Sequence, residues 1–274
     1  MNTTNPIAKI AKFTILDEIR QRSFVVMFIV CVAFVFLARG CYRGNYVVNG
    51  VALDAATVVA AVSKAAFHVI AVVTMLIAAL LSMRMFRRDR DGGMQSAILS
   101  KPMTRRHYVL GKVIGLWVLS ALFMLILQAI VLLTVVISAG VAIPGYPVAA
   151  LLCCLNLLFV VIAVLLLSLF MPETAAFLCI MGIAVVGLII DGINALGGSQ
   201  MAQAMTGPTQ TLSLRKILYY VWPKLSGMQY FASSFIGGGG FQGLRSVYPL
   251  FNMLFYCLIL CVLLLWRFRK EEIV

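Results

Sequence analysis

Long apolar runs separated by short polar segments make up most of the chain. Most of these runs reach the ~20 residues that an α-helix needs to cross a bilayer. Periodicity does not separate such runs from buried helices of soluble proteins, but their length and number do. The pattern therefore predicts an all-α integral membrane protein with six transmembrane helices. The predicted spans lie at about 24–38, 65–86, 113–139, 148–170, 175–195 and 247–266.

Composition supports the same class of protein. Of the 274 residues, 63% are hydrophobic and only 11% are charged, whereas a soluble domain has roughly 25% charged residues. The mean hydropathy is +1.05. Too few polar residues are present to cover a water-facing surface, so we expect one transmembrane domain over residues 1–274.

The N-terminal segment has features of a signal peptide, because basic residues precede the first apolar run. That run ends in L-A-R-G-C at residues 37–41. Arg39 occupies the place at which a lipoprotein cleavage site has a small neutral residue. We therefore interpret the segment as an uncleaved signal anchor.

Lysine and arginine residues predict the orientation of the spans. Six spans place both termini on one side of the membrane. This side, which includes the loop between spans two and three, carries about twice as many Lys and Arg residues as the other. Because positive residues favour the cytoplasmic side, both termini and this loop are predicted to be cytoplasmic. The net charge of +13 flanks the spans, so it reports topology and does not indicate a nucleic-acid partner.

Motifs for catalysis and metal binding are missing from the sequence. It contains no G-x-x-x-x-G-K-[ST] phosphate-binding loop and no H-E-x-x-H zinc motif. No Ser/His or paired-carboxylate arrangement falls within a predicted span. We therefore predict that the chain is not an enzyme by itself, and that it holds no catalytic residue, metal or cofactor of its own.

Polar residues are rare within the predicted spans, and those present are candidates for a substrate pathway. They are Gln128, Asn156, Asp191 and Asn194. Charged residues inside a membrane are unfavourable and are functional candidates by default, and Asp191 is the one clear case. Two interpretations of Asp191 stay open, a structural place near the outer interface and a role in the pathway.

The densest charge in the chain lies in the loop between spans two and three, residues 87–112. Seven Lys or Arg and two Asp fall within it. One interpretation is a solvated basic loop beside anionic lipid. The order of residues inside the loop must decide between this interpretation and a docking surface for another protein.

That order favours a docking surface. The glycine pair at 92–93 interrupts the preceding helix. Met94, Ala97 and Ile98 then recur at i, i+3 and i+4, which gives a short helix a small apolar face. Pro102 ends this helix. A loop that only meets lipid does not need these features in this order.

The loop resembles the first cytoplasmic loop of ABC type-2 permeases in the pattern D-x-D-G-G-M-x-x-A-I-L-S-K-P-M-T-R-R-H-Y-V-L-G-K. In that family an acidic pair and a glycine precede a short apolar helix. The motif L-S-x-P-[IVM]-[ST]-R follows, and G-K opens the third span. This chain has Asp89 and Asp91 where the family often has Glu, and Met94 where it often has Thr. The segment W-P-K-L at 222–225 also resembles an outer stretch of members grouped with multicopper-enzyme maturation permeases.

The layout of the chain agrees with the same family. A basic helix at 1–23 is similar to the family's interfacial helix, and a large outer loop covers 196–246. The resemblance implies the permease subunit of an ATP-driven exporter in a bacterial-type cytoplasmic (inner) membrane. It also implies two permease chains, identical or different, and two copies of a cytoplasmic ATPase that binds ATP and Mg.

The resemblance further implies that a short helix of the loop seats in the ATPase subunit. ATP-driven closure of the ATPase pair would then reorient the neighbouring spans. The residues expected in this coupling are Asp89, Asp91, Gly92, Gly93, Met94, Ala97, Ile98, Leu99, Ser100, Pro102, Arg105 and Arg106. Membrane lipids are further partners, and the presence of periplasmic or accessory subunits stays open.

Two other functions stay open at this point. A secondary carrier needs coupling residues near the membrane midplane, and the few polar residues in the spans disfavour it. A membrane anchor or assembly factor without transport would show no dependence on a partner ATPase. The sequence defines neither the substrate nor the direction of transport.

Overall fold

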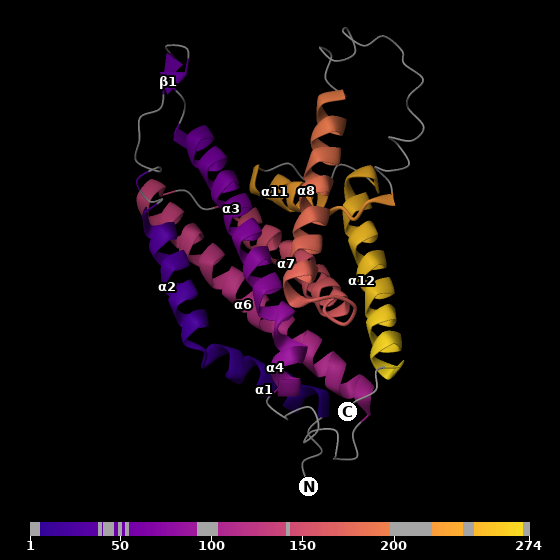
Figure 1. The fold of residues 1–274 in the computed structure, drawn as a ribbon. Coiled ribbons are helices and arrows are strands. Elements are labelled where there is room, and N and C mark those ends of the chain that lie inside the picture. Colours follow the sequence, from indigo (N-terminus) through magenta and orange to yellow (C-terminus); the bar gives the residue numbers. More distant parts are fainter. Residues whose placement is uncertain are drawn as a thin grey trace.

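The computed structural model describes residues 6–37, 40, 47–48, 51–52, 55–91, 104–140, 143–197, 221–237 and 244–270. Nearly all of them are helical (Figure 1), which confirms the predicted all-α membrane fold. The helices are α1 (Pro6–Ile19), α2 (Arg22–Leu37), α3 (Ala55–Met83), α4 (Met85–Asp91), α6 (Arg105–Ala139), α7 (Gly145–Leu167), α8 (Glu173–Gly197), α11 (Leu225–Ser234), the 3-10 helix η2 (Phe235–Gly237) and α12 (Leu244–Lys270). Two short strands, β1 (Val47–Val48) and β2 (Val51–Ala52), pair antiparallel.

Five described helices are long and apolar enough to cross a membrane, namely α3 with its continuation α4, α6, α7, α8 and α12. The pair α1 and α2 gives a sixth when it is counted as one span, although the two helices meet at 71°. Helix α6 begins at Arg105, so the helix that carries the third predicted span extends well before residue 113. Both termini lie at the same end of the bundle (Figure 1).

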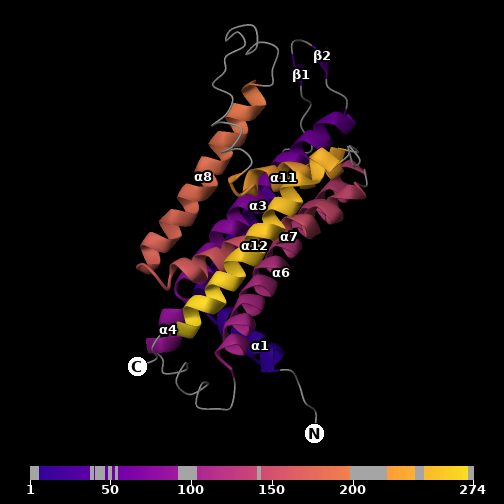
Figure 2. The same cartoon turned by 90° about the vertical axis from the view of Figure 1, so that its right-hand side faces the viewer.

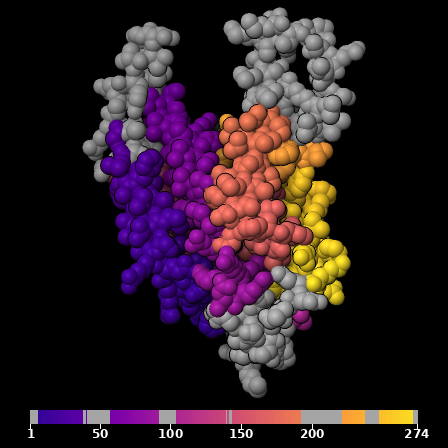
Figure 3. Space-filling view, in the orientation of Figure 1, coloured from indigo at the N-terminus to yellow at the C-terminus, as the bar shows by residue number. Residues whose placement is uncertain are grey.

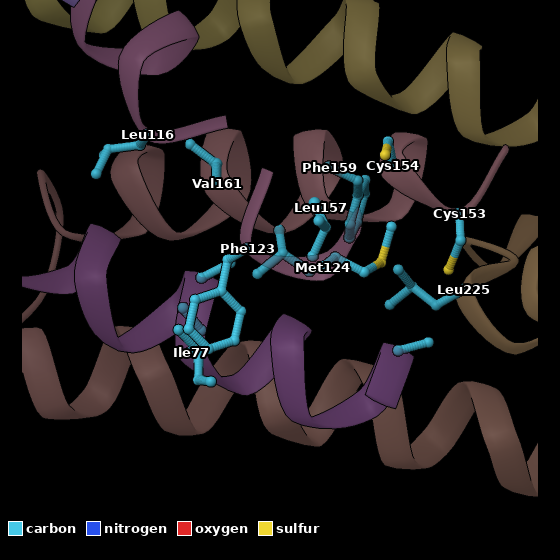
Figure 4. Close-up of a cluster of buried hydrophobic side chains, with 14 of the residues drawn as sticks. Ile77, Leu116, Phe123, Met124, Cys153, Cys154, Leu157, Phe159, Val161 and Leu225 are labelled. Atoms are coloured by element: carbon cyan, nitrogen blue, oxygen red, sulfur yellow. The ribbon is translucent and has the colours of Figure 1, made fainter. Parts of the chain in front are cut away.

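Helix α7 lies at the centre of the bundle and α8 at its edge. In their most apolar stretches, 72% of α7 is buried inside the protein but only 17% of α8. Figure 4 shows Phe123 and Met124 of α6 gathered with Leu157 of α7 and Ile77 of α3. Figure 3 shows α8 on the surface between α3 and α12. Helix α7 is therefore the scaffold, and α8 has most of its surface free to face lipid.

Helix α1 lies directly on the first part of α6, because α6 carries two glycines there. A Cβ added at Gly111 would lie 2.7 Å from the Cβ of Ile10, and one at Gly115 would lie 2.8 Å from the Cβ of Thr14. Glycines four residues apart line up on one face of a helix and let a second helix approach closely. The backbone of α1 is thereby brought against α6.

Replacing Gly115 by alanine is expected to lower the free energy of unfolding by about 1–3 kcal/mol, because the added methyl group overpacks this contact. The matched control is Gly182→Ala in α8, where an added Cβ meets no atom within 4 Å. There alanine is expected to be neutral or stabilising by up to about 1 kcal/mol. SDS-induced unfolding in mixed micelles measures both variants. Equal effects at the two positions would contradict the close contact of α1 with α6.

Candidate functional site

Helix α4 leads into the loop that is predicted to bind an ATPase. It follows α3 after a break at Arg84 and ends at Asp91, and the described chain resumes at Thr104, just before α6. Residues 92–103, the central part of the predicted docking segment, lie outside the described residues. The contacts of α4 and of the start of α6 therefore define how the loop is joined to the bundle.

Asp89 joins α4 to α6 through a buried ion pair. Its Oδ2 lies 2.7 Å from Nζ of Lys112 and accepts a hydrogen bond of 2.5 Å from the hydroxyl of Tyr108. The side chains of Asp89 and Lys112 are only 2% and 4% exposed. Asp89 therefore faces the inside of the protein, and this contact replaces the one with a partner protein that the sequence predicted for it.

Arg88 joins α4 to α1. Its Nη2 lies 2.5 Å from Oδ2 of Asp17 and 2.6 Å from Oε1 of Glu18. Nε2 of Gln21 donates a hydrogen bond of 3.1 Å to the other carboxylate oxygen of Glu18. One guanidinium group thus pairs with two carboxylates, of which Glu18 is buried and Asp17 is at the surface. The position of α1 therefore depends on that of α4.

Looser contacts join α4 to α8 and α12. Glu173, at the start of α8, lies 3.7 Å from Arg84 and 3.6 Å from Arg87, but both arginine side chains are largely exposed. Exposed ion pairs of this kind contribute at most about 1 kcal/mol. The ring of Phe86 packs against Phe268 of α12, with centroids 5.4 Å apart. Helix α4 thus contacts α1, α6, α8 and α12.

Two of the predicted coupling residues are exposed beside the loop. The side chain of Asp91 is 69% exposed and lies 3.6 Å from Arg87, and Arg106 is exposed at the start of α6. Arg105 is half-buried and donates a hydrogen bond of 3.4 Å to the carbonyl of Arg269. Other members of the predicted set lie outside the described residues; these are Gly92, Gly93, Met94, Ala97, Ile98, Leu99, Ser100 and Pro102.

Two of the amides predicted to line a substrate pathway form hydrogen bonds between neighbouring helices. Gln128 accepts a hydrogen bond of 2.5 Å from Tyr146 of α7 and donates one of 3.4 Å to the carbonyl of Phe67 in α3. Asn156 donates one of 2.9 Å to the carbonyl of Leu225 in α11. These contacts do not bring the two amides to a shared site.

Asp191 forms an ion pair with Lys224, a residue that the sequence did not mark as functional. Nζ of Lys224 lies 2.6 Å from Oδ1 of Asp191, with side chains 2% and 13% exposed, and the hydroxyl of Ser226 donates to Oδ2 of Asp191. Burial lowers the pKa of the Lys224 ammonium group, although the hydrogen bond and charge of Asp191 act to raise it. Asn194 belongs to α8, but its side chain lies outside the described residues.

Trp222 fastens the same segment to α8. Its Nε1 donates a hydrogen bond of 3.1 Å to the carbonyl of Ile183, and an added Cβ at Gly187 would lie 3.2 Å from this nitrogen. The backbone N–H of Lys224 donates one of 3.1 Å to Oδ1 of Asn252 in α12. These contacts join the segment 221–226 to both α8 and α12. We call the following residues the clamp: Asp191, Trp222, Lys224 and Ser226.

Helix α11 begins directly after Lys224 of the clamp and lies among the longer helices (Figure 2), with most of its residues buried. Its ten residues measure ~15 Å at 1.5 Å per residue, which is half of the ~30 Å hydrocarbon core of a bilayer. It packs against α7, α8, α12 and α3. Part of the predicted outer loop at 196–246 is therefore a helix inside the bundle.

Both charged clusters bring oppositely charged groups together. In the part of the chain that the structure describes, no three His, Cys, Asp or Glu residues form a group that could hold a metal ion. The first cluster joins α4 to α1 and α6, and the second joins the segment 221–226 to α8.

Comparison with known proteins agrees with this architecture. The chain matches the family model described as ABC-2 family transporter protein over residues 8–273, and no curated protein matches it. The family match covers almost the whole chain and confirms the resemblance that the loop motif indicated. With its apolar helices, the chain is a multi-pass membrane protein of the permease type. The chain therefore belongs to the ABC-2 family of transporter membrane proteins.

Proposed function

We propose that the chain is the permease subunit of an ATP-driven exporter, in which α4 passes movement from a separate ATPase subunit to the other helices. Two permease chains and two ATPase chains would form the transporter, with ATP and Mg bound by the ATPase. The observation that carries this proposal is the position of α4, which precedes residues 92–103 and contacts α1, α6, α8 and α12. The loop motif and the distribution of positive charge support a cytoplasmic position of this loop, where an ATPase can reach it.

The buried pair of Asp89 and Lys112 connects the two helices on either side of this loop. Asp89 belongs to the helix that enters the loop, and Lys112 belongs to the helix that leaves it. A load on the loop is therefore passed to α4 and α6 together. In this mechanism Asp89 is a positioning residue, and the exposed Asp91 and Arg106 are available to the ATPase.

Helix α1 would move with the same unit. Arg88 pairs with Asp17 and Glu18, and α1 lies on the two glycines of α6. Helices α1 and α4 and the start of α6 thus act as one body at the end of the bundle where the termini lie (Figure 1). A push on this body tilts the spans that continue from it, which are α2, α3 and α6.

The double change Ile98→Asp with Asp91→Lys is expected to lower the affinity for the ATPase about tenfold, or about 1.4 kcal/mol. It puts a charge on the predicted apolar contact and reverses an exposed acidic group, and like charges across an interface disfavour binding. Co-purification and stimulation of ATPase activity measure the effect. A P-loop ATPase encoded beside the gene of this chain is the partner to test.

The matched control for this experiment is Lys270→Glu. Lys270 is exposed at the end of α12, and this end of α12 lies at the same end of the bundle as α4 (Figure 1). Reversing its charge is expected to leave both co-purification and ATPase stimulation unchanged. Full co-purification of the double variant would contradict docking at the loop, and an equal loss in the control would show a general effect of surface charge.

A further inference from the structure

An apolar groove lies between α8 and the rest of the bundle. Helix α8 is held at one end by Glu173 with its exposed arginine partners, and at the other end by Asp191 with Lys224. Between these two sets of ion pairs, α8 lies at the edge of the bundle (Figure 2). A cavity of about 140 Å³ remains there against α3, α7 and α11.

Most of the residues that line this groove are apolar. Its floor includes Ala79 of α3, Val160 of α7 and Ile180 of α8, none of them more than 3% exposed. Its rim includes Val72 of α3 and Leu188 of α8, which are 44% and 61% exposed. No charged side chain is found among the described lining residues. Because the rim belongs to helices that can span a membrane, the groove opens toward hydrocarbon.

Polar groups enter this lining only from α11. Ser226 and Gln229 are the two polar residues in it, and Ser226 also bonds to Asp191 of the clamp. The amide nitrogen of Gln229 lies 4.0 Å from the sulfur of Met75. A molecule in the groove would therefore meet apolar side chains over most of its length and polar groups beside α11. This distribution matches an amphiphile.

The dimensions of the groove fit a single hydrocarbon chain. From Ile180 to Leu188, both of which line it, α8 advances ~12 Å at 1.5 Å per residue. One leaflet of the hydrocarbon core is ~15 Å deep. An α-helix with its side chains is ~10 Å wide, which is too wide for a cavity of about 140 Å³. Water needs two to four polar partners to occupy a cavity, and the floor offers none.

We propose that this groove binds one acyl chain of a membrane lipid, with the polar part of the lipid beside Ser226 and Gln229. Binding itself does not depend on ATP. That the bound lipid is cargo, which would make a lipid or lipid-linked molecule the substrate class, rests on the proposed function. The lipid enters sideways between Val72 and Leu188, since both belong to the exposed rim.

Photo-crosslinking tests this proposal on the full chain in nanodiscs. The probe is a phosphatidylcholine that carries a diazirine in the middle of one acyl chain, and mass spectrometry locates the label. Label is expected on the floor residues Ala79, Val160 and Ile180, although they are buried, at levels comparable to those on Phe255 of α12, which is 62% exposed. The proposal would be overturned if the amount of label on each residue followed only its exposed fraction, so that the floor residues carried none.

A matched pair of variants on α8 sharpens the test. Ala184→Phe fills the groove, whereas Val186→Phe makes the same side chain at a position that is 40% exposed and is not part of the lining. The first is expected to lower the floor label several-fold, and the second to leave it unchanged. The proposal would be contradicted if the label on the floor residues were unchanged in Ala184→Phe. Protection of the floor residues by a second copy of the chain would contradict it as well. Labelling of the floor residues in the unmodified chain tests the proposal even if one of the variants fails to fold.

The partner ATPase separates binding from transport. Adding it with ATP is expected to reduce the floor label, because the cargo leaves the groove. A label that persists during ATP hydrolysis would overturn the role as cargo but not the binding site. If the ATPase did not dock at the loop at all, the ATP effect would vanish while the label remained, so failure of the proposed function is distinguishable from failure of this site.

Discussion

Replacing Lys112 by methionine is expected to lower the free energy of unfolding by about 3–5 kcal/mol, because removing one partner of a buried ion pair leaves the other charge buried alone. Asp89 would keep its hydrogen bond from Tyr108 but lose the ammonium group 2.7 Å away. With the side chains only 2% and 4% exposed, water cannot take the place of the missing partner. SDS-induced unfolding in mixed micelles measures the loss.

A second substitution separates the charge pair from simple packing. Combining Lys112→Met with Asp89→Asn removes both charges, while the asparagine oxygen still accepts the hydrogen bond from Tyr108, so most of the stability should return. The matched control is Arg87→Gln, which breaks exposed ion pairs and should stay within about 1 kcal/mol of the unmodified chain. If Lys112→Met were no more harmful than Arg87→Gln, the buried pair would not be what joins α4 to α6.

The same double variant tests the proposed mechanical role. Its helices α4 and α6 would be joined by a neutral hydrogen bond in place of an ion pair. We expect it to bind the ATPase normally but to couple ATP hydrolysis to transport less well. If both binding and coupling were unchanged, α4 and α6 would not need this pair to move together.

The membrane-spanning helices could be predicted from the sequence, because a helix in lipid must present apolar side chains over ~20 residues whatever its neighbours are. Most of the run at 148–170 belongs to α7 (Gly145–Leu167), which has the highest mean hydropathy of the five candidate spans, 3.1. How much of each helix is buried inside the bundle could not be predicted. The run at 175–195 is also strongly apolar, yet α8 is mostly unburied, since an apolar face suits lipid as well as protein.

Within the loop motif, the sequence placed Asp89 and Asp91 in the same role, but the structure separates them. Both belong to α4, and residues two apart on an α-helix point ~200° away from each other. Asp89 consequently faces Lys112 inside the protein, while Asp91 is 69% exposed. The glycine pair that follows lies outside the described residues.

The partners in the ion pairs could not be predicted from the sequence. Asp17 and Arg88 are 71 positions apart, and Asp191 and Lys224 are 33 apart. Such contacts depend on how the helices pack, which hydrophobic patterns do not specify. The one available hint was Lys224 itself, a single cation between Trp-Pro and an apolar segment, because a charge in such surroundings needs a partner.

Replacing Lys224 by methionine is expected to release α8 at the end remote from the termini and to lower the free energy of unfolding by about 3–5 kcal/mol. Asp191 would keep its hydrogen bond from Ser226 but lose a partner whose side chain is only 2% exposed. The effect should be concentrated in α8, because little of its apolar stretch is buried and the clamp supplies a large share of its contacts. Faster hydrogen exchange of the amides at 176–190 would report the release.

Two matched variants decide whether the ion pair or the apolar contacts hold α8. Lys224→Met with Asp191→Asn removes both charges and should regain most of the stability, since asparagine can still accept from Ser226. Glu173→Gln removes the ion pairs with the exposed Arg84 and Arg87 at the other end of α8. It should change the free energy of unfolding by about 1 kcal/mol or less. If Lys224→Met sped up exchange no more than Glu173→Gln, apolar packing would hold α8 and the clamp would have no mechanical role. If exchange in Lys224→Met is much faster than in Glu173→Gln, α8 is held mainly at the clamp and only loosely near α4. Movement of α4 can then shift the end of α8 at Glu173 while the clamp holds the end at Asp191.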